Sequence, residues 1–411
     1  MELIEKKCDY YQFLSQFMSI LHDGHTGFYN LDDCNEGDSG NDVLPFEIEA
    51  AKGKFYISKV LKELTETIPL GSELLEVDNQ PTLDYLNRVY IPFAIGNTFQ
   101  SRLKKALSNF SIGTYKKSIT IRIKTPQGKT EEKEVAYNTY ANYNNPEFIS
   151  ILKEKREGTD LFMKKDINNI PFFYFRYDDF DTDKVSPILN HIAEEVKQAD
   201  YLVLDLRRNP GGSESIADSV LMCFLNIDTL KTYQSITRIN HALKTAKGYG
   251  YPEYREYYEG IALDTLPESV LIKKNLPLFD QPLFILISEE TCSAAEDLLI
   301  TLKLHYPNRA ILVGSPTSGS TGAPLIRLLS DKVYYRICTR APLLPEGLFE
   351  EGILPDYYYS SSWEEMVSGE DRIFEFVGKI FAEKHKNDGI LYKCTARDFN
   401  DTQYSICKFC F

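Results

Sequence analysis

The chain has 411 residues, 43% of them hydrophobic and 26% charged, which is typical of a globular protein of two or three domains. The net charge of −14 argues against nucleic acid as a partner, because that binding depends on clustered Lys and Arg. No apolar stretch approaches the roughly 18 residues of a membrane-spanning helix. The N-terminal MELIEKKCDYYQFL lacks the features of a signal peptide, so we expect either a cytoplasmic protein or a leader upstream of this sequence.

The first part of the chain divides into a helical segment and a β-rich module. Apolar positions at helical spacing run over residues 9–22 and end in LHDGHTGFY, followed by an Asp-, Asn- and Gly-rich loop. From residue 45 short alternating strands follow, and TPQGK has the composition of a hairpin turn between two of them. We predict an N-terminal helical segment over residues 1–44 and a β-rich module over residues 45–140.

The remainder, residues 141–411, has the pattern of a layered α/β domain. Three continuous apolar runs, YLVLDLR (201–207), PLFILIS (282–288) and AILVG (310–314), are typical of strands covered on both faces. Each run neighbours a helical pattern, and a last helix is predicted over WEEMVSGEDRIFEFVGKIFAEKHK. These features predict a catalytic or binding core with helices on both sides of a sheet.

SEETCSAAED (288–297) places a Cys beside a Ser between a strand and a helix. Ser293 falls in the first helical turn, where free N–H groups and the helix dipole favour a developing anion. Ser293 or Thr291 also suits a plain N-cap, and Glu296 suits a capping box with Ser293. These residues alone leave open whether Ser293 is a nucleophile.

VLDLRRNPGGSES places Gly211 and Gly212 directly after a buried strand. Adjacent glycines let backbone N–H groups approach a ligand closely, which suits an oxyanion hole or a phosphate cradle. An ordinary strand-to-helix turn is the alternative. The phosphate option is disfavoured because the chain has no G-x-x-x-x-G-K-[ST] motif.

Together with GSPTSGSTGAP (314–324) and FEEGILPDYYY, these segments resemble, in the same order, the carboxyl-terminal-processing (tail-specific) and tricorn-like serine peptidases. The resemblance covers roughly residues 1 to 30 and 170 to 360. It implies that Ser293 is the nucleophile and that Cys292 is a small buried filler. It also implies an oxyanion hole built from the N–H of Ala294 with that of Gly211 or Gly212.

The same resemblance bears on the general base. Tail-processing enzymes use a Lys in the loop after the nucleophile, but Ser320 stands at that position here, so a Ser-Lys dyad is not expected. Tricorn-like members use an early His, and DGHT places His25 there. A neutral imidazole near its ordinary pKa of ~6.5 can deprotonate a serine hydroxyl. For the carboxylate that orients His25 the resemblance indicates Glu351, with Glu350 and then Glu346 as alternatives.

The fold implied is α/β, with a crotonase/ClpP-like layered ββα catalytic domain and an inserted PDZ-like module, to which IPLGSELLEVDNQPTLDYL is similar. The function implied is a serine endopeptidase or carboxyl-terminal processing peptidase that acts on a peptide or protein and needs no metal or organic cofactor. Such relatives are often exported to the bacterial cell envelope, which would place a leader upstream. The sequence does not indicate the substrate or the oligomeric state.

Alternative functions remain at this stage. A non-catalytic binding protein on the same scaffold is one, although it has no need to keep both Ser293 and His25. An α/β-hydrolase is disfavoured because G-x-S-x-G is absent. His22 and His25 form H-x-x-H, yet no third ligand group or H-E-x-x-H accompanies them. The C-x-x-C of the tail (residues 407–410) lacks a second pair and predicts no zinc site.

Overall fold

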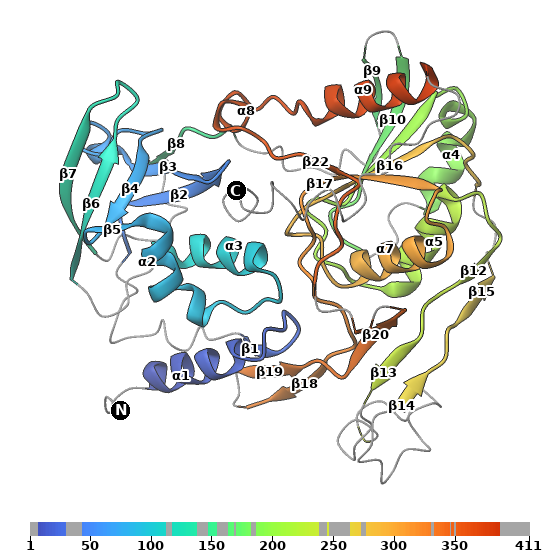
Figure 1. The fold of residues 1–411 in the computed structure, drawn as a ribbon, viewed down its shortest axis with the longest axis horizontal. Coiled ribbons are helices and arrows are strands. Elements are labelled where there is room, and N and C mark those ends of the chain that lie inside the picture. Colours follow the sequence, from blue (N-terminus) through green and yellow to red (C-terminus); the bar gives the residue numbers. More distant parts are fainter. Residues whose placement is uncertain are drawn as a thin grey trace.

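A computed structural model gives the fold of the chain (Figure 1). The structure describes these residues: 7–29, 43–111, 117–137, 147–153, 163–167, 170–181, 186–237, 245, 264–272, 277–329, 333–345, 347–348 and 351–386. The C-x-x-C of the tail lies outside them. Among the described residues, no helix combines the length and apolar character needed to cross a membrane.

The β-rich unit is an antiparallel sheet in the order β2-β3-β4-β6-β7, to which β5 and β8 add at β4 and β3. Its strands and helices are β2 (Phe46–Ala51), β3 (Lys54–Leu61), β4 (Glu73–Val77), β5 (Gln80–Pro81), β6 (Ser118–Lys124), β7 (Thr130–Ala136), β8 (Phe148–Ser150), α2 (Thr82–Val89) and α3 (Phe99–Phe110), with short helices η2 (Lys62–Leu64) and η3 (Ile91–Phe93). Alternate residues of β6 (Ile119, Ile121 and Ile123) point into a core shared with Phe110. The sheet continues past the predicted boundary at residue 140, because β8 pairs with β3.

The second unit is a six-stranded sheet in the order β22-β17-β16-β11-β10-β9, parallel except for the β9–β10 pair. Its strands are β9 (Met163–Ile167), β10 (Ile170–Arg176), β11 (Tyr201–Asp205), β16 (Leu283–Ile287), β17 (Ala310–Gly314) and β22 (Tyr357–Tyr358). Every residue of β11 and β16 is buried, which confirms the prediction of strands covered on both faces.

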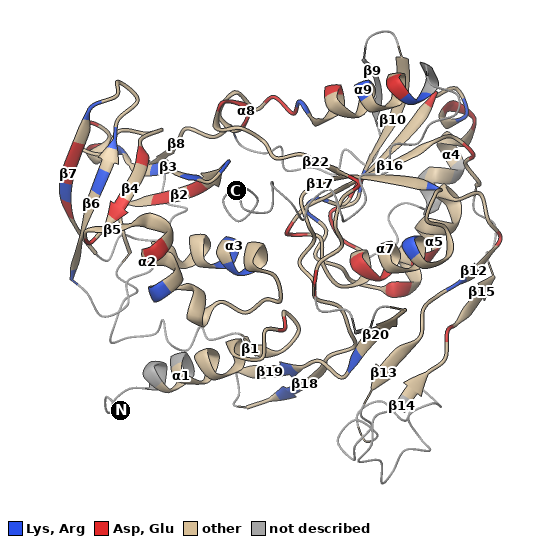
Figure 2. Ribbon diagram, in the orientation of Figure 1, with Lys and Arg blue, Asp and Glu red and all other residues tan. Residues whose placement is uncertain are grey.

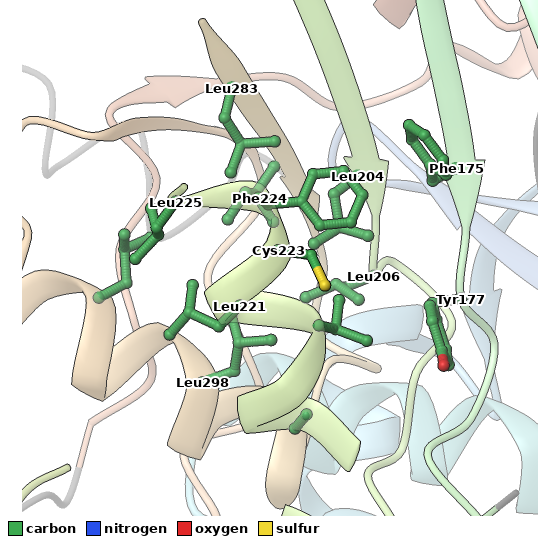
Figure 3. Close-up of a cluster of buried hydrophobic side chains, with 14 of the residues drawn as sticks. Phe175, Tyr177, Leu204, Leu206, Leu221, Cys223, Phe224, Leu225, Leu283 and Leu298 are labelled. Atoms are coloured by element: carbon green, nitrogen blue, oxygen red, sulfur yellow. The ribbon is translucent and has the colours of Figure 1, made fainter. Parts of the chain in front are cut away.

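Helices cover the two faces of this sheet. On one face α4 (Ser186–Val196), α5 (Glu214–Phe224) and α7 (Ala294–His305) form the larger core. On the other face packs α9 (Ile373–Lys386), which follows the short α8 (Trp363–Ser368) in the chain. Figure 3 shows the larger core, where Leu204 of β11 meets Phe224 of α5, and Leu221 of α5 lies near Leu298 of α7. The chain therefore has a mixed α/β fold, as the sequence predicts.

The N-terminal segment joins this unit through a small sheet. After α1 (Lys7–Ser19), strand β1 (Gly27–Tyr29) pairs with β19 (Tyr334–Ile337), which also pairs with β18 (Leu325–Leu328). The other small sheets contain β12 (Thr229–Lys231), β13 (Ser235–Thr237), β14 (Asp264–Leu266), β15 (Val270–Ile272), β20 (Arg340–Leu344) and β21 (Gly347–Leu348). The pairing of β1 with β19 places residues 23–26 against the loop that follows β17.

Candidate active site

Ser293 lies at the junction of β16 and α7 in a backbone conformation that few residues adopt. Its φ is 56° and its ψ is −126°, whereas non-glycine residues rarely have positive φ. Such strain costs on the order of 1–3 kcal/mol and concentrates at functional sites. The Ser293 N–H donates to the carbonyl of Ser320 over 2.9 Å, and its own carbonyl accepts from the first turn of α7. The backbone is thus fixed on both sides.

The turn before Ser293 is held by Thr291, and this frees the serine side chain. The Thr291 hydroxyl donates to the carbonyl of Leu206 over 2.7 Å and accepts from the N–H of Ser288 over 3.0 Å. Ser293 makes no side-chain cap, and its Oγ lies instead 2.9 Å from Nε2 of His25. Ser293 thus occupies the N-cap position of α7, but its side chain does not cap the helix.

His25 is buried, with 4% of its surface exposed, and both ring nitrogens have hydroxyl neighbours. Nδ1 lies 2.7 Å from Oγ of Ser320, whose hydroxyl donates to Oδ1 of Asp23 over 3.2 Å. A hydroxyl has one hydrogen, so when Ser320 donates to Asp23 it accepts from Nδ1–H. The imidazole then has its lone pair on Nε2, where it accepts the Ser293 hydroxyl hydrogen.

The surroundings of His25 lower its pKa from the ordinary 6.5 to about 4. Burial is the largest cause, because it disfavours the charged imidazolium, and the positive charge of Arg336 acts in the same direction. The carboxylate of Asp23 opposes both effects. His25 is consequently neutral near pH 7, the state that a general base needs.

Gly211 lies directly against the serine. A Cβ on Gly211 would stand 2.4 Å from Cβ of Ser293, and φ at Gly211 is 107°, so both the space and the backbone require glycine. The N–H of Gly211 donates to Oδ1 of Asn209 over 2.8 Å, and Asn209 is itself buried and bonded to the carbonyl of Tyr177. Asn209 thereby fixes the glycine turn beside the serine.

The predicted oxyanion donors differ in their hydrogen bonding. Gly211 N–H already has an acceptor, while within the described part of the chain no group accepts from the N–H of Gly212 or of Ala294. Ala294 is the first residue of α7, where backbone N–H groups lack intrahelical partners. Ala294 follows the serine directly in the chain, and Gly212 follows the glycine that contacts it.

Cys292 differs from Ser293 in its environment. Burial raises the pKa of the Cys292 thiol to about 12, and its Sγ donates to the carbonyl of Ser320 over 3.2 Å. A thiol is nucleophilic as thiolate, so a cysteine held protonated is inert near pH 7. Cys292 is half-buried rather than fully buried, so the role of a buried filler stays a prediction.

Glu296 fastens the loop that carries Ser320. The carboxylate is fully buried and accepts from the Thr317 hydroxyl, from Gly319 N over 2.7 Å and from Ser320 N over 2.8 Å. The predicted capping box between Glu296 and Ser293 is therefore wrong, because the loop donors occupy the carboxylate. Burial nonetheless raises the pKa of Glu296 to about 7.

The predicted acidic partner of His25 is not at the ring. Glu351 is exposed and no described contact joins it to His25, while Glu346 and Glu350 lie outside the described residues. Asp23 lies next to His25 instead: its Oδ1 accepts from the backbone N–H of His25 over 3.0 Å and from the hydroxyl of Ser320. The sequence signal for Asp23 was its place two residues before His25 in HDGHT.

Neither metal binding nor a Ser-Lys dyad finds support in the described residues. His22 lies with Nε2 3.1 Å from a guanidinium nitrogen of Arg102, and no group of three or more His, Cys, Asp or Glu side chains in the described ranges is arranged to hold a metal ion. Within the same ranges, the hydrogen-bond partners of Ser293 include no lysine.

Comparison with known families agrees with this geometry. Residues 172–359 match the model of Peptidase family S41. The match confirms the family resemblance inferred from the motifs, and it supports hydrolase activity of the serine peptidase type. It spans β10 to β22 and contains Ser293, both glycines and Glu351, whereas His25 and Asp23 lie outside it.

Solved structures share the fold over nearly the whole chain. Mature CPAF is 17% identical with a TM-score of 0.64, covering 92% of this chain and 88% of CPAF. A serine-to-alanine mutant of CPAF is 18% identical with a TM-score of 0.64, covering 96% of this chain and 91% of the mutant. At these identities the likeness establishes the fold. No curated protein matches the sequence.

Proposed function

We propose that this chain is a serine peptidase in which Ser293 is the nucleophile and His25 is the general base. The observation that carries the proposal is the 2.9 Å contact between Nε2 of His25 and Oγ of Ser293. This distance lies within the range needed for direct proton transfer. The S41 match supports a peptide or protein as substrate.

The reaction follows from the geometry. As Oγ of Ser293 attacks the scissile carbonyl, Nε2 of His25 takes its proton, and the carbonyl oxygen becomes an oxyanion. The N–H groups of Gly212 and Ala294 are the proposed oxyanion donors, since both lack other acceptors within the described ranges. The imidazolium then protonates the leaving amine, and a water molecule activated by His25 hydrolyses the acyl-enzyme.

Ser320 and Asp23 are the proposed positioning residues for His25. The Ser320 hydroxyl accepts a hydrogen bond from Nδ1–H of His25 and donates its own hydrogen to the carboxylate of Asp23. The negative charge of Asp23 stabilises the imidazolium that forms during attack, because it raises the pKa of His25. That Glu351 orients His25 stays a prediction from the family resemblance.

We also propose that the catalytic unit has the crotonase/ClpP-like layering and that the β-rich unit is a PDZ-like insertion between His25 and the core. The support is that the β-rich unit has a hydrophobic core of its own, between the His25 segment and β10 in chain order. The division into domains at residues 1–44, 45–140 and 141–411 remains a prediction.

Intact-mass spectrometry after reaction with a fluorophosphonate tests the assignment. Attack by Oγ of Ser293 forms an O–P bond, fluoride leaves, and His25 takes the proton. We expect one adduct on the wild type and on Cys292→Ala, and none on Ser293→Ala or His25→Ala. A folded wild type without an adduct would favour a binding protein on this scaffold. Loss of the adduct in Cys292→Ala alone would mean that the thiol is the nucleophile.

A further inference from the structure

One face of the small sheet β1-β19-β18 continues directly from the catalytic histidine. Across this sheet Gly27 pairs with Arg336 and Arg336 with Ile326, while the next pairs on the same face are Tyr29 with Tyr334 and Tyr334 with Leu328. Gly27 follows His25 by two residues, so this face begins at the active site. Ile326 and Leu328 are 53% and 73% exposed, which leaves its outer half open to solvent.

Among the described residues of this face, Arg336 is the one charged side chain, and no described acidic group forms an ion pair with it. Within the described residues it forms no ion pair and donates no hydrogen bond, and its Nε is buried without a partner. Strands β1, β18 and β19 contain no acidic residue, and in Figure 2 the ribbons of β18 and β19 have blue segments for basic residues and no red ones. An unpaired arginine is notable in a chain whose acidic residues exceed its basic ones, 60 to 46.

Aromatic packing holds the Arg336 side chain in place. Its guanidinium carbon lies 5.1 Å from the centre of the Tyr29 ring, a cation–π contact, and Tyr29 stacks on Tyr334 with centroids 5.5 Å apart. The Tyr29 hydroxyl donates to the carbonyl of Gly24 over 3.1 Å, next to His25. These contacts restrict the guanidinium to one orientation before a ligand binds.

The pairing of Arg336 with Gly27 and its contact with Tyr29 place this guanidinium near the reacting groups. Its charge lowers the pKa of His25, and it opposes the burial that raises the pKa of Tyr29, a phenol that also feels the Cys292 thiol. The nearest acidic group of the active site, Asp23, is engaged by His25, Thr26 and Ser320 and forms no ion pair with Arg336. Within the described part of the chain, the positive charge near His25 is thus left without an acidic partner.

We propose that Arg336 binds a carboxylate of the peptide substrate near the scissile bond. This inference rests on the proposed function. A guanidinium presents parallel N–H groups that match a carboxylate in a two-pronged contact, which fixes orientation as well as charge. Ile326 and Leu328 lie farther along the same face and offer apolar contact to neighbouring substrate residues. The carboxylate belongs either to an Asp or Glu side chain or to the C-terminus of the substrate.

Matched peptide pools distinguish these sources. Octapeptides with random positions carry Glu or Gln at one fixed position, each with a free or an amidated C-terminus, and mass spectrometry measures cleavage. We expect the wild type to cleave one carboxylate-bearing pool about ten- to a hundredfold faster than its amide counterpart. A Glu-over-Gln preference identifies a side chain, and an acid-over-amide preference at the terminus identifies the substrate's end. Equal cleavage of all pools overturns the proposal without any variant.

Variants assign the preference to Arg336. We expect Arg336→Gln to cleave the carboxylate-bearing and amide pools at equal rates, and Arg336→Lys to retain part of the preference. Arg327→Gln is the matched control, because Arg327 pairs with Tyr335 on the opposite face of the same sheet. A preference that persists in Arg336→Gln would overturn the assignment.

Two readouts separate this inference from the proposed function. Fluorophosphonate labelling of the wild type reports on Ser293 and His25 and involves no carboxylate of a substrate. Peptide binding to Ser293→Ala, followed by fluorescence anisotropy, tests carboxylate preference without catalysis. Labelling could fail while Ser293→Ala still binds carboxylate peptides more tightly than amide peptides. If the double variant Ser293→Ala, Arg336→Gln then loses this binding preference, the peptidase proposal falls and the Arg336 proposal stands. If labelling is normal but no carboxylate preference is found, the peptidase proposal stands and the Arg336 proposal falls.

Discussion

The Nδ1 atom of His25 lies 2.7 Å from the hydroxyl oxygen of Ser320, where a serine protease more commonly has a carboxylate. The carboxylate of Asp23 stands one step farther away, 3.2 Å from the same hydroxyl. The charge that stabilises imidazolium therefore reaches the ring through a neutral group. This arrangement makes the contribution of Ser320 separable from that of Asp23 by single substitutions.

Ser320→Ala should lower kcat while leaving KM nearly unchanged. The substitution removes the acceptor of the Nδ1 hydrogen, and a hydrogen bond to a group that becomes charged is worth about 2 kcal/mol, or roughly thirtyfold in rate. Ser315→Ala is the control, since Ser315 lies in the same loop but its hydroxyl donates to Glu289. A rise in KM with constant kcat would contradict a positioning role.

Asp23→Asn and Glu351→Gln compare the two candidate acids. We expect Asp23→Asn to reduce kcat/KM by roughly a hundredfold or more, because the amide provides no negative charge for the imidazolium. Glu351→Gln should stay within about threefold of the wild type, because Glu351 is exposed and has no described contact with His25. The opposite ranking, measured on folded proteins by steady-state kinetics, would restore Glu351 to the orienting role.

The sequence predicts Ser293 and His25 as a catalytic pair because each stands in a short local pattern, and the two side chains lie within hydrogen-bond distance in the structure. SAAE follows a buried strand and DGHT follows a helix, and such local signals survive at low identity. The strands β11, β16 and β17 were predictable for a similar reason, since residues buried on both faces are continuously apolar.

The partners of these residues were harder to predict because they depend on contacts across almost 300 positions. Asp23 and Ser320 meet only after β1 pairs with β19, a register that no local pattern encodes. Glu296 was assigned to a capping box by its spacing from Ser293. The buried N–H groups of the loop at Gly319 and Ser320 also require an acceptor, and that tertiary requirement prevails.

The acidic limb of the pH profile should lie well below the ordinary histidine pKa. Protonated His25 cannot accept the serine proton, and its pKa is lowered to about 4, so activity should fall only as the pH drops through about 4 rather than 6.5. Fluorophosphonate labelling rates after brief pH jumps would measure this limb, with circular dichroism confirming the fold at each pH. A midpoint near 6.5 would show that His25 is not held in this environment.

Glu296→Gln should destabilise the protein and slow catalysis together. One carboxylate accepts from three groups of the loop, but an amide offers a single acceptor oxygen and turns an NH2 group toward backbone donors. Buried donors left without partners cost about 1–3 kcal/mol, which urea unfolding would detect. Glu289→Gln is the control, since Glu289 accepts from Ser315 near the surface. Equal unfolding midpoints for wild type and Glu296→Gln would contradict this role.

Gly211→Ala should abolish labelling and hydrolysis, and Gly128→Ala provides its matched control. Both glycines have positive φ, 107° and 84°, so alanine at either position carries backbone strain of about 1–2 kcal/mol. A Cβ at Gly128 meets nothing within 4 Å, whereas at Gly211 it would stand 2.4 Å from Cβ of Ser293. We therefore expect a small loss of stability in Gly128→Ala and a larger one in Gly211→Ala, with a loss of activity of roughly a hundredfold or more in Gly211→Ala alone, because displacement of a nucleophile by about 1 Å has such an effect. Full labelling of folded Gly211→Ala would show that the serine and the glycine turn are not in contact as described.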